Sequence, residues 1–405
     1  MHETISINQL KPGMFVVQVS KQTGSVKIKN QGWVKTAAAI EKLKKVGVLE
    51  VIIDPSKTLT KDKPAAPEQV SKPPETQPPA TPAAADPWAS SVSVEAEMSK
   101  ASALYNEAKN LQMKAFADIK AGLVIDVAPF KDVAQGFMDS VFRQQDALTC
   151  LTRMREKDAY LMEHSINVSI LITIFAKHLR LDSQLTHELA TGALLHDIGK
   201  IKISDDILQK PGKLTEQEFL EVQQHARFSK EILEQAGLSG VAVEIAGYHH
   251  ERIDGTGYPF GVKGEELSIY ARMASIVDVY DALTAERVYK VGMTPIQAFK
   301  LLNEGAGSKF DETLLTLFIQ CIGVHPVGTL VKLSNHKVGI VSRSNPSNPL
   351  KPTVKVFYNA KHGRYVEVED INLAKGRTDI TLEAAIKPEL FNLDLLRFFK
   401  TSVLS

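Results

Sequence analysis

The chain has only two cysteines among its 405 residues, Cys150 and Cys321, and they stand far apart in the sequence. No Cys-x-x-Cys pair occurs, which excludes a disulfide framework and a thiolate zinc site. This sparing use of cysteine is typical of a reducing compartment. We therefore expect a cytoplasmic protein.

The sequence also lacks a secretory signal and a membrane-spanning run. Residues 1–4 contain no basic region that leads into an apolar segment. The most apolar long stretch, residues 166–176, is interrupted by polar side chains and is too short to cross a bilayer, so it predicts a buried helix. The formal net charge is only +1, which gives no overall attraction to polyanions. We expect neither a nucleic acid polymer nor a membrane as a partner.

Composition changes sharply along the chain and predicts several units. Residues 55–87 contain nine prolines and almost no large apolar side chains, so they cannot bury a core. They are predicted to form a solvated linker, with a proline-rich docking segment as the alternative. The predicted units are a small α+β domain (1–54), a Pro/Ala-rich linker (55–90), a connecting helix (91–125), an all-α domain (126–324) and a small β-rich extension (325–405).

Hydrophobic periodicity predicts the elements within these units. In the first unit we expect strands at 5–10, 14–19 and 48–53 and a helix at 36–46. Long helices follow at 94–121 and 127–156. The extension is predicted to contain strands at 329–333, 338–342, 353–358 and 364–368 and a closing helix at 388–399.

The first chemical motif is the pair His196-Asp197 at the end of an apolar run. A buried histidine beside a buried aspartate is costly unless the pair binds a ligand or forms hydrogen bonds. Taken alone, the pair is equally compatible with a hydrogen bond in a core. Lys200 follows four residues after His196 and shares its face if the helix continues.

The second motif, at residues 249–259, reads His-His-Glu-Arg-Ile-Asp-Gly-Thr-Gly-Tyr-Pro. Consecutive histidines on a helix point about 100° apart, so they can bind two metal ions or one ion from two sides. The glycines at 255 and 257 predict a loop that approaches a ligand closely. A purely structural explanation of the whole string is hard to sustain, and we interpret it as part of a metal site.

Together these strings resemble the HD and GYP signatures of HD-GYP phosphodiesterases, which hydrolyse the bacterial second messenger cyclic di-GMP. The resemblance covers about residues 158–300 and extends to Glu163-His164-Ser165, to His225 and to the segment 278–284. It implies a two-metal centre in which Asp197 bridges the ions. The ligands that it implies are His164, His196, Asp197, His225, His249, His250 and Asp278. It further implies catalytic roles for Asp197 and Lys200 and substrate contacts for Lys200, Tyr258, Asp281, Arg287 and Lys290.

The ligand chemistry narrows the choice of metal. Imidazole and carboxylate ligands together fit iron or manganese, with zinc or nickel as alternatives, and are too rich in nitrogen for magnesium or calcium alone. Family members with three ions use a glutamate four residues before the first ligand histidine, where this chain has Tyr160. Glu163 would face elsewhere on the helix, so we predict two divalent ions. The motif after residue 284 keeps both cations, Arg287 and Lys290, but has valine in place of the family's proline.

The resemblance implies a metal-dependent phosphodiesterase that converts cyclic di-GMP to pGpG, with onward cleavage to GMP left open. The alternatives are a catalytically weak cyclic di-GMP sensor and a phosphodiesterase for another cyclic dinucleotide such as cyclic GMP-AMP. The filled ligand set favours the enzyme, because degenerate members lose ligands. Residues 1–54 resemble a small domain of unknown function that precedes such domains. Regulatory protein contacts through this unit or the GYP loop (residues 255–259) are expected, and a homodimer stays open.

Overall fold

The computed structural model divides the chain into two compact units, Met1–Thr81 and Pro82–Ser405. The boundary lies within the predicted linker, whose residues 56–90 are outside the described part. The described residues are 3–11, 14–23, 32–34, 40, 41, 43, 44, 47–55, 91–153, 160–285, 292–345, 348–375 and 379–391.

The first unit contains an antiparallel sheet with the strand order β1-β4-β2-β3. Its strands are β1 (Glu3–Ser6), β2 (Phe15–Gln22), β3 (Gly32–Trp33) and β4 (Val48–Ile53). The strand predicted at 5–10 ends at Ser6 because Ser6 and Gln9 form a capping box that starts the 3-10 helix η1 (Ile7–Gln9). Of the helix predicted at 36–46, residues 40, 41, 43 and 44 are described, and they are helical.

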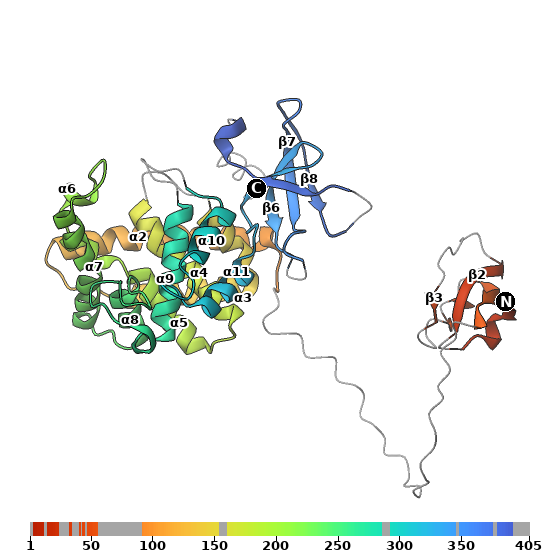
Figure 1. Ribbon diagram of the computed structural model, residues 1–405, viewed down its shortest axis with the longest axis horizontal. Coiled ribbons are helices and arrows are strands. Elements are labelled where there is room, and N and C mark those ends of the chain that lie inside the picture. The colour runs from red at the N-terminus through yellow and green to blue at the C-terminus, as the bar shows by residue number, and fades with distance from the viewer. Residues whose placement is uncertain are drawn as a thin grey trace, which may run out of the picture. The chain divides into compact units, whose positions relative to one another are not determined.

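The second unit is mainly helical, which confirms the predicted all-α domain (Figure 1). Residues 166–176 form part of the buried helix that their composition predicts, and Ile166, Ile170 and Phe175 have no exposed surface. Among the described residues, no helix combines the length and apolarity needed to cross a bilayer. The helices are α2 (Val94–Lys120), α3 (Ala128–Thr152), α4 (Tyr160–His178), α5 (Ser183–Leu195), α6 (Asp205–Leu208), α7 (Glu216–Gln235), α8 (Val241–Tyr248), α9 (Ile269–Thr284), α10 (Pro295–Asn303) and α11 (Glu312–Ile322), with the 3-10 turns η4 (Ile198–Lys202) and η5 (Gly264–Glu266).

Side-chain caps define the residues at which α5 and α7 begin. Asp182 caps α5, and Thr215 forms a capping box with Glu218 at the start of α7. α3 is kinked at Gln144, whose backbone is not helical and whose amide donates a 2.9 Å hydrogen bond to the carbonyl of Val92. The long helix predicted at 127–156 is therefore interrupted, because Gln144 bonds to the segment that leads into α2.

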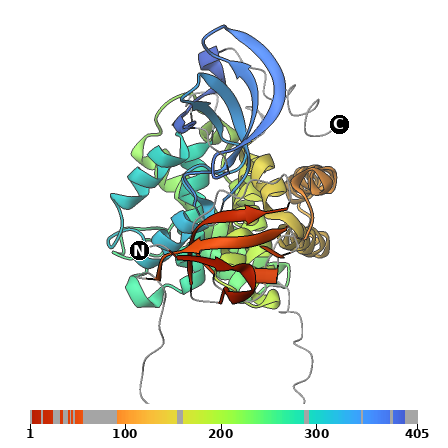
Figure 2. The ribbon, with the colours of Figure 1, turned by 90° about the vertical axis from the view of Figure 1, so that its right-hand side faces the viewer.

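The C-terminal part of the second unit is an antiparallel sheet with the order β8-β7-β6-β5-β9, which lies to one side of the helices in both views (Figure 1, Figure 2). Ser344 joins it to α3 through a 3.2 Å hydrogen bond to Asp146. The strand β9 was not predicted, and of the helix predicted at 388–399 only the 3-10 turn η6 (Pro388–Phe391) lies in the described part. The strands are β5 (Leu330–Leu333), β6 (Lys337–Arg343), β7 (Thr353–Asn359), β8 (Arg364–Asn372) and β9 (Leu382–Ala385).

Candidate metal centre

Seven histidines and aspartates predicted as ligands lie together where the helices of the second unit converge. His164 lies in α4, His225 in α7 and Asp278 in α9. The other four lie at helix ends: His196 and Asp197 between α5 and η4, and His249 and His250 after α8. The backbone changes direction at these ends, which brings adjacent side chains toward the same place. Sequence motifs more than a hundred residues apart thus form one cluster.

Gly199 allows η4 to pack directly on α7. A Cβ atom at this position would lie 2.2 Å from the carbonyl oxygen of His225 and 2.4 Å from the backbone nitrogen of Ser229. The Gly199 N–H donates a 2.8 Å hydrogen bond to the Ser229 hydroxyl. This close packing brings the Asp197 carboxylate to 3.3 Å from Nε2 of His225.

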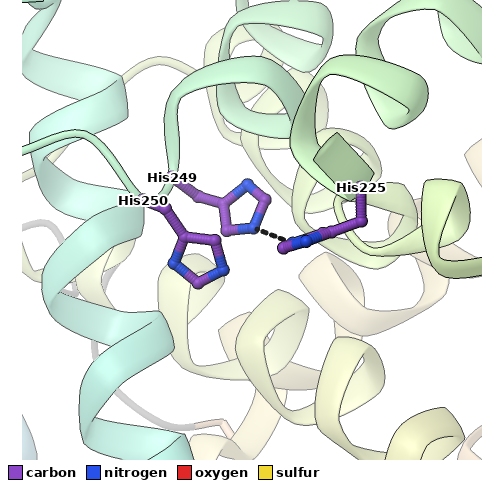
Figure 3. A group of neighbouring side chains, drawn as sticks. All are labelled: His225, His249 and His250. Carbon is purple, nitrogen blue, oxygen red and sulfur yellow. Dashed lines mark hydrogen bonds between the residues drawn. The ribbon is translucent and has the colours of Figure 1, made fainter. Parts of the chain in front are cut away.

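Backbone carbonyls set the orientation of three of the histidine rings. Nδ1 of His196, His225 and His249 donates to a carbonyl about one turn earlier, at 2.7, 2.6 and 3.1 Å respectively. Because a carbonyl only accepts, each Nδ1 carries the hydrogen, and Nε2 of the neutral ring presents a lone pair. Nε2 of His225 and Nε2 of His249 face one another at 3.3 Å (Figure 3).

The arrangement fits a bound cation. Two facing lone pairs repel one another unless a proton or a cation lies beside them. Nε2 of His196 and Oδ1 of Asp197 are buried and have no hydrogen-bond partner within the described part of the chain, which is costly for polar atoms. Divalent ions beside these atoms would satisfy them, and imidazole nitrogens with carboxylate oxygens are suitable ligands. Groups whose ligand atoms lie within 4.8 Å of one another are His225, His249 and His250; His164, His196 and Asp278; and His196, Asp197 and His249.

His164 lies between two carboxylates of α9. Its Nε2 is 2.9 Å from Asp278 Oδ1, and its Nδ1 is 2.8 Å from Asp281 Oδ2. Burial lowers the pKa of His164, but the two carboxylates outweigh burial and raise this pKa to about 9. Asp278 and Asp281 share a helix face because they are three residues apart. That spacing was the available sequence signal for Asp281 as a partner of His164.

Asp281 was predicted to contact the substrate, but its surroundings indicate a different role. Its side chain is completely buried behind His164, so it has no surface to offer a substrate. A carboxylate that accepts Nδ1–H of a histidine leaves Nε2 free to bind a metal ion, and such partners orient ligand rings in many metal sites. Asp281 therefore has the geometry of a residue that positions a ligand.

The electrostatics of Asp197, Asp278 and His250 favour the protonation states that bind metals, whereas the raised pKa of His164 favours its protonated form. Burial would raise the pKa of Asp197, but the charges of Lys200 and His196 hold it well below its usual value. Burial acts in the same way on Asp278, and its neighbouring histidines hold its pKa well below normal. Burial lowers the pKa of His250 well below that of a free imidazole. Anionic carboxylates and neutral imidazoles are the states that metal ligation requires.

The predicted substrate contacts are described only in part. Lys200 forms an ion pair with Asp197 at the edge of the cluster. The ring of Tyr258 lies 4.7 Å from the ring of His250, and burial raises the pKa of its hydroxyl. Arg287 and Lys290 lie outside the described residues, so their role stays a prediction.

Glu163 faces away from the ligand groups, as its sequence position predicts. Its buried carboxylate pairs with Lys109 of α2 at 3.0 Å. None of the groups of neighbouring metal-binding side chains found in the described residues includes it. The side chain of Tyr160, at the position where a third ion would require a carboxylate, is outside the described part.

Glu251 is a further structural residue of the site that the sequence did not reveal. Its buried carboxylate accepts hydrogen bonds from three consecutive backbone N–H groups, those of residues 260, 261 and 262, at 2.7, 3.1 and 3.1 Å. Gly257 packs so closely on this residue that a Cβ would lie 2.4 Å from the Glu251 Cα. The GYP loop is thus folded back onto the residues that follow His250.

Comparisons with known proteins agree with this geometry. Residues 145–314, which include all seven predicted ligands, match the HD domain family. Residues 2–130 match a domain of unknown function (DUF3391), and residues 330–391 match a KOW domain associated with HD domain. The DUF3391 match extends beyond the N-terminal unit through α2 to the start of α3, the HD match lies in the helical domain, and the KOW match covers the C-terminal sheet.

Several curated proteins are similar to the chain. A cyclic di-GMP phosphodiesterase of Pseudomonas aeruginosa is 35% identical over 400 residues, which cover 97% of this chain and 95% of the relative. A 3'3'-cGAMP-specific phosphodiesterase of Vibrio cholerae is 36% identical over 42% of this chain and 37% of its own length. A cyclic di-GMP phosphodiesterase response regulator of Xanthomonas campestris is 37% identical over 42% of this chain and 46% of its own length.

Proposed function

We infer that this chain, which belongs to the family of HD-domain cyclic di-GMP phosphodiesterases, hydrolyses the phosphodiester bond of cyclic di-GMP. The observation that carries this inference is the convergence of buried lone pairs at His196, Asp197, His225 and His249, which bound cations would satisfy. Such a centre suits a phosphodiester, because phosphate hydrolysis requires an activated water and neutralisation of negative charge. The products we propose are pGpG and, by a second cleavage, GMP.

We propose that the cluster holds two divalent ions, iron or manganese, with zinc or nickel as alternatives. His164, His196 and Asp278 would bind one ion, and His225, His249 and His250 the other, with Asp197 shared between them. Two ions in such a site supply activation of water and charge neutralisation on the phosphate. The mixed nitrogen and oxygen ligands support this choice of metals.

The chain's own residues prepare the site for this reaction. Asp281 holds the ring of His164 by accepting its Nδ1–H, and backbone carbonyls hold His196, His225 and His249 in the same way. Rigid ligands reduce the reorganisation that the reaction requires. Burial excludes water from all but one edge of the cluster, which strengthens every electrostatic interaction inside it.

Lys200 is proposed to act on the substrate. Its ammonium group pairs with Asp197 and stands at the accessible edge of the cluster. Bound cations would compensate the charge of Asp197, and the Lys200 ammonium would then be available to a phosphate oxygen. We propose that it donates a hydrogen bond to the phosphate and stabilises the negative charge on the leaving oxygen.

Cyclic GMP-AMP is the second candidate substrate, because one relative is a 3'3'-cGAMP-specific phosphodiesterase. The two substrates share the phosphodiester and differ in one base, so the same metal chemistry would serve both. The cyclic di-GMP relative covers nearly the whole chain, and therefore cyclic di-GMP is preferred. We propose further that residues 1–54 form a domain that receives a regulatory protein, separate from the hydrolytic domain of residues 126–324.

The decisive experiment is anaerobic incubation of the full chain with cyclic di-GMP and iron(II) or manganese(II), with products followed by chromatography. The Asp197→Ala variant should lose metal and turnover. Asp205→Ala is the matched control, because Asp205 is an exposed aspartate that pairs with Lys120 on the surface. Wild-type conversion that survives in Asp205→Ala and disappears in Asp197→Ala supports the proposal. Tight binding of cyclic di-GMP without turnover in either metal would refute hydrolysis and indicate a sensor.

A further inference from the structure

Among the seven predicted ligands, all of which are described, exposure to solvent is concentrated at His250. The side chain of His250 is 17% exposed, whereas the other six predicted ligands are 4% exposed or less. Lys200 is also 17% exposed. A substrate that reaches the ions must therefore approach past His250 and Lys200, and its remaining groups must lie on the surface beside them.

Aromatic rings lead outward from this opening. The ring of Tyr258 lies 4.7 Å from the ring of His250 at an interplanar angle of 37°. The ring of Phe219, in the first turn of α7, lies 6.2 Å from Tyr258 and is nearly perpendicular to it, at 77°. His250, Tyr258 and Phe219 thus form a continuous series of rings from the metal centre to the surface.

Phe219 is an exposed aromatic residue beside this opening, with a relative exposure of 47%. Burial of a phenylalanine ring stabilises a protein, and an exposed ring does not make this contribution. The capping box of Thr215 and Glu218 holds the helix start, so the position of Phe219 on the surface is set by well-defined backbone. The exposed ring is therefore available to a ligand at the edge of the centre.

We propose that the exposed ring of Phe219, beside Tyr258, forms a stacking surface for a nucleobase of the bound cyclic dinucleotide. This inference rests on the proposed function and adds a base-binding site to it. Every nucleobase has a planar π face, and stacking on an aromatic side chain contributes free energy with any base. The phosphate lies at the ions and Lys200, and the base of the same nucleotide lies outward over the rings. Phe219 thus contributes affinity for the dinucleotide and does not distinguish guanine from adenine.

A packing role for Phe219 makes a different prediction. If the ring served only to support Tyr258 or the start of α7, a leucine of similar bulk would replace it. Removal of the ring would then also weaken ligands that have no base, because the opening of the metal centre would be disturbed. A stacking role requires an aromatic face and affects only ligands that carry a base.

The test compares Phe219→Ala, Phe219→Leu and Phe219→Trp in the full chain, with Leu220→Ala as the matched control. Leu220 is the next residue of α7 and is 59% exposed, but it has no ring. KM and kcat are measured for cyclic di-GMP. The inhibition constant of inorganic phosphate, a ligand without a base, is measured in parallel, together with metal content.

The alanine and leucine variants should raise KM by roughly 5- to 150-fold, the range that corresponds to the loss of one base–aromatic stack. Tryptophan should restore the wild-type KM, and phosphate inhibition, metal content and Leu220→Ala should remain unchanged. An unchanged KM in Phe219→Ala, full rescue by leucine, or an equal loss of phosphate inhibition would overturn the proposal.

The proposed function can fail separately from this inference. If the wild-type chain binds cyclic di-GMP but does not hydrolyse it, the same variants are compared by their dissociation constants in titration calorimetry. The stacking surface then stands if the alanine and leucine variants weaken binding and tryptophan restores it. It falls if all four variants bind like the wild type.

Discussion

Replacing Gly199 by alanine would test whether the close packing of η4 on α7 positions the metal ligands. The added methyl group would lie 2.2 Å from the carbonyl oxygen of His225 and 2.4 Å from the backbone nitrogen of Ser229. Both atoms belong to the backbone of a helix, so neither can rotate away. The two elements must separate, and Asp197 on η4 must move away from His225 on α7.

The size of the effect follows from these distances. Nonbonded contacts of this kind are comfortable at about 3.5 Å, so the elements must separate by roughly 1 Å. Overpacking of a close-packed interior costs about 1–3 kcal/mol, and loss of the hydrogen bond to Ser229 costs about 1 kcal/mol more. A displacement of this size at a catalytic centre lowers turnover by roughly 10²-fold.

Scanning calorimetry, metal analysis and steady-state kinetics measure these effects together. We expect Gly199→Ala to show a lower Tm, less bound metal and reduced kcat/KM. Gly247→Ala is the matched control, because Gly247 lies in α8 and its added Cβ would approach only the flexible side chain of Lys230, at 3.1 Å. That variant should keep its metal. If Gly199→Ala retained the wild-type Tm and metal content, the packing argument would be wrong.

Three further predictions concern other parts of the second unit. Lys200→Met should keep the bound metal, because the Lys200 side chain is not a ligand. It should lower kcat by roughly 10²-fold or more. A loss of metal equal to that of Asp197→Ala would contradict this role. Glu251→Gln should lower the unfolding free energy by on the order of 2 kcal/mol, because the NH2 group of glutamine would face backbone N–H donors. Urea titration measures this change, and an unchanged midpoint would refute the anchoring of the GYP loop by Glu251. Burial raises the pKa of Asp146 in the folded protein. The stability linked to its protonated form is therefore fully present below the pKa of an unfolded aspartate, and it is lost as the pH rises through the raised pKa. Asp146→Asn should therefore flatten stability between acidic and neutral pH in urea titrations, and an unchanged slope would remove Asp146 as the cause.

Much of the helical domain could be predicted because its signals are local. The apolar run around Ile170 and the periodicity of residues 94–121 indicate helices within short windows, and both helices are present. The kink at Gln144 and the strand β9 were missed, because each depends on a partner far away in the chain. A hydrogen bond from Gln144 to Val92 leaves no periodic trace in either segment.

The sequence by itself determined which side chains carry the chemistry. His196-Asp197 and His249-His250 are adjacent in the chain, and imidazole and carboxylate groups bind metals wherever they converge. Only the tertiary structure decided how they converge. It set which ring nitrogen faces the centre, and it placed Asp281 behind His164. It also placed Phe219 beside the opening. The physical reason is that ligand type is a property of a residue, whereas orientation, burial and access arise from contacts between distant segments that no local pattern records.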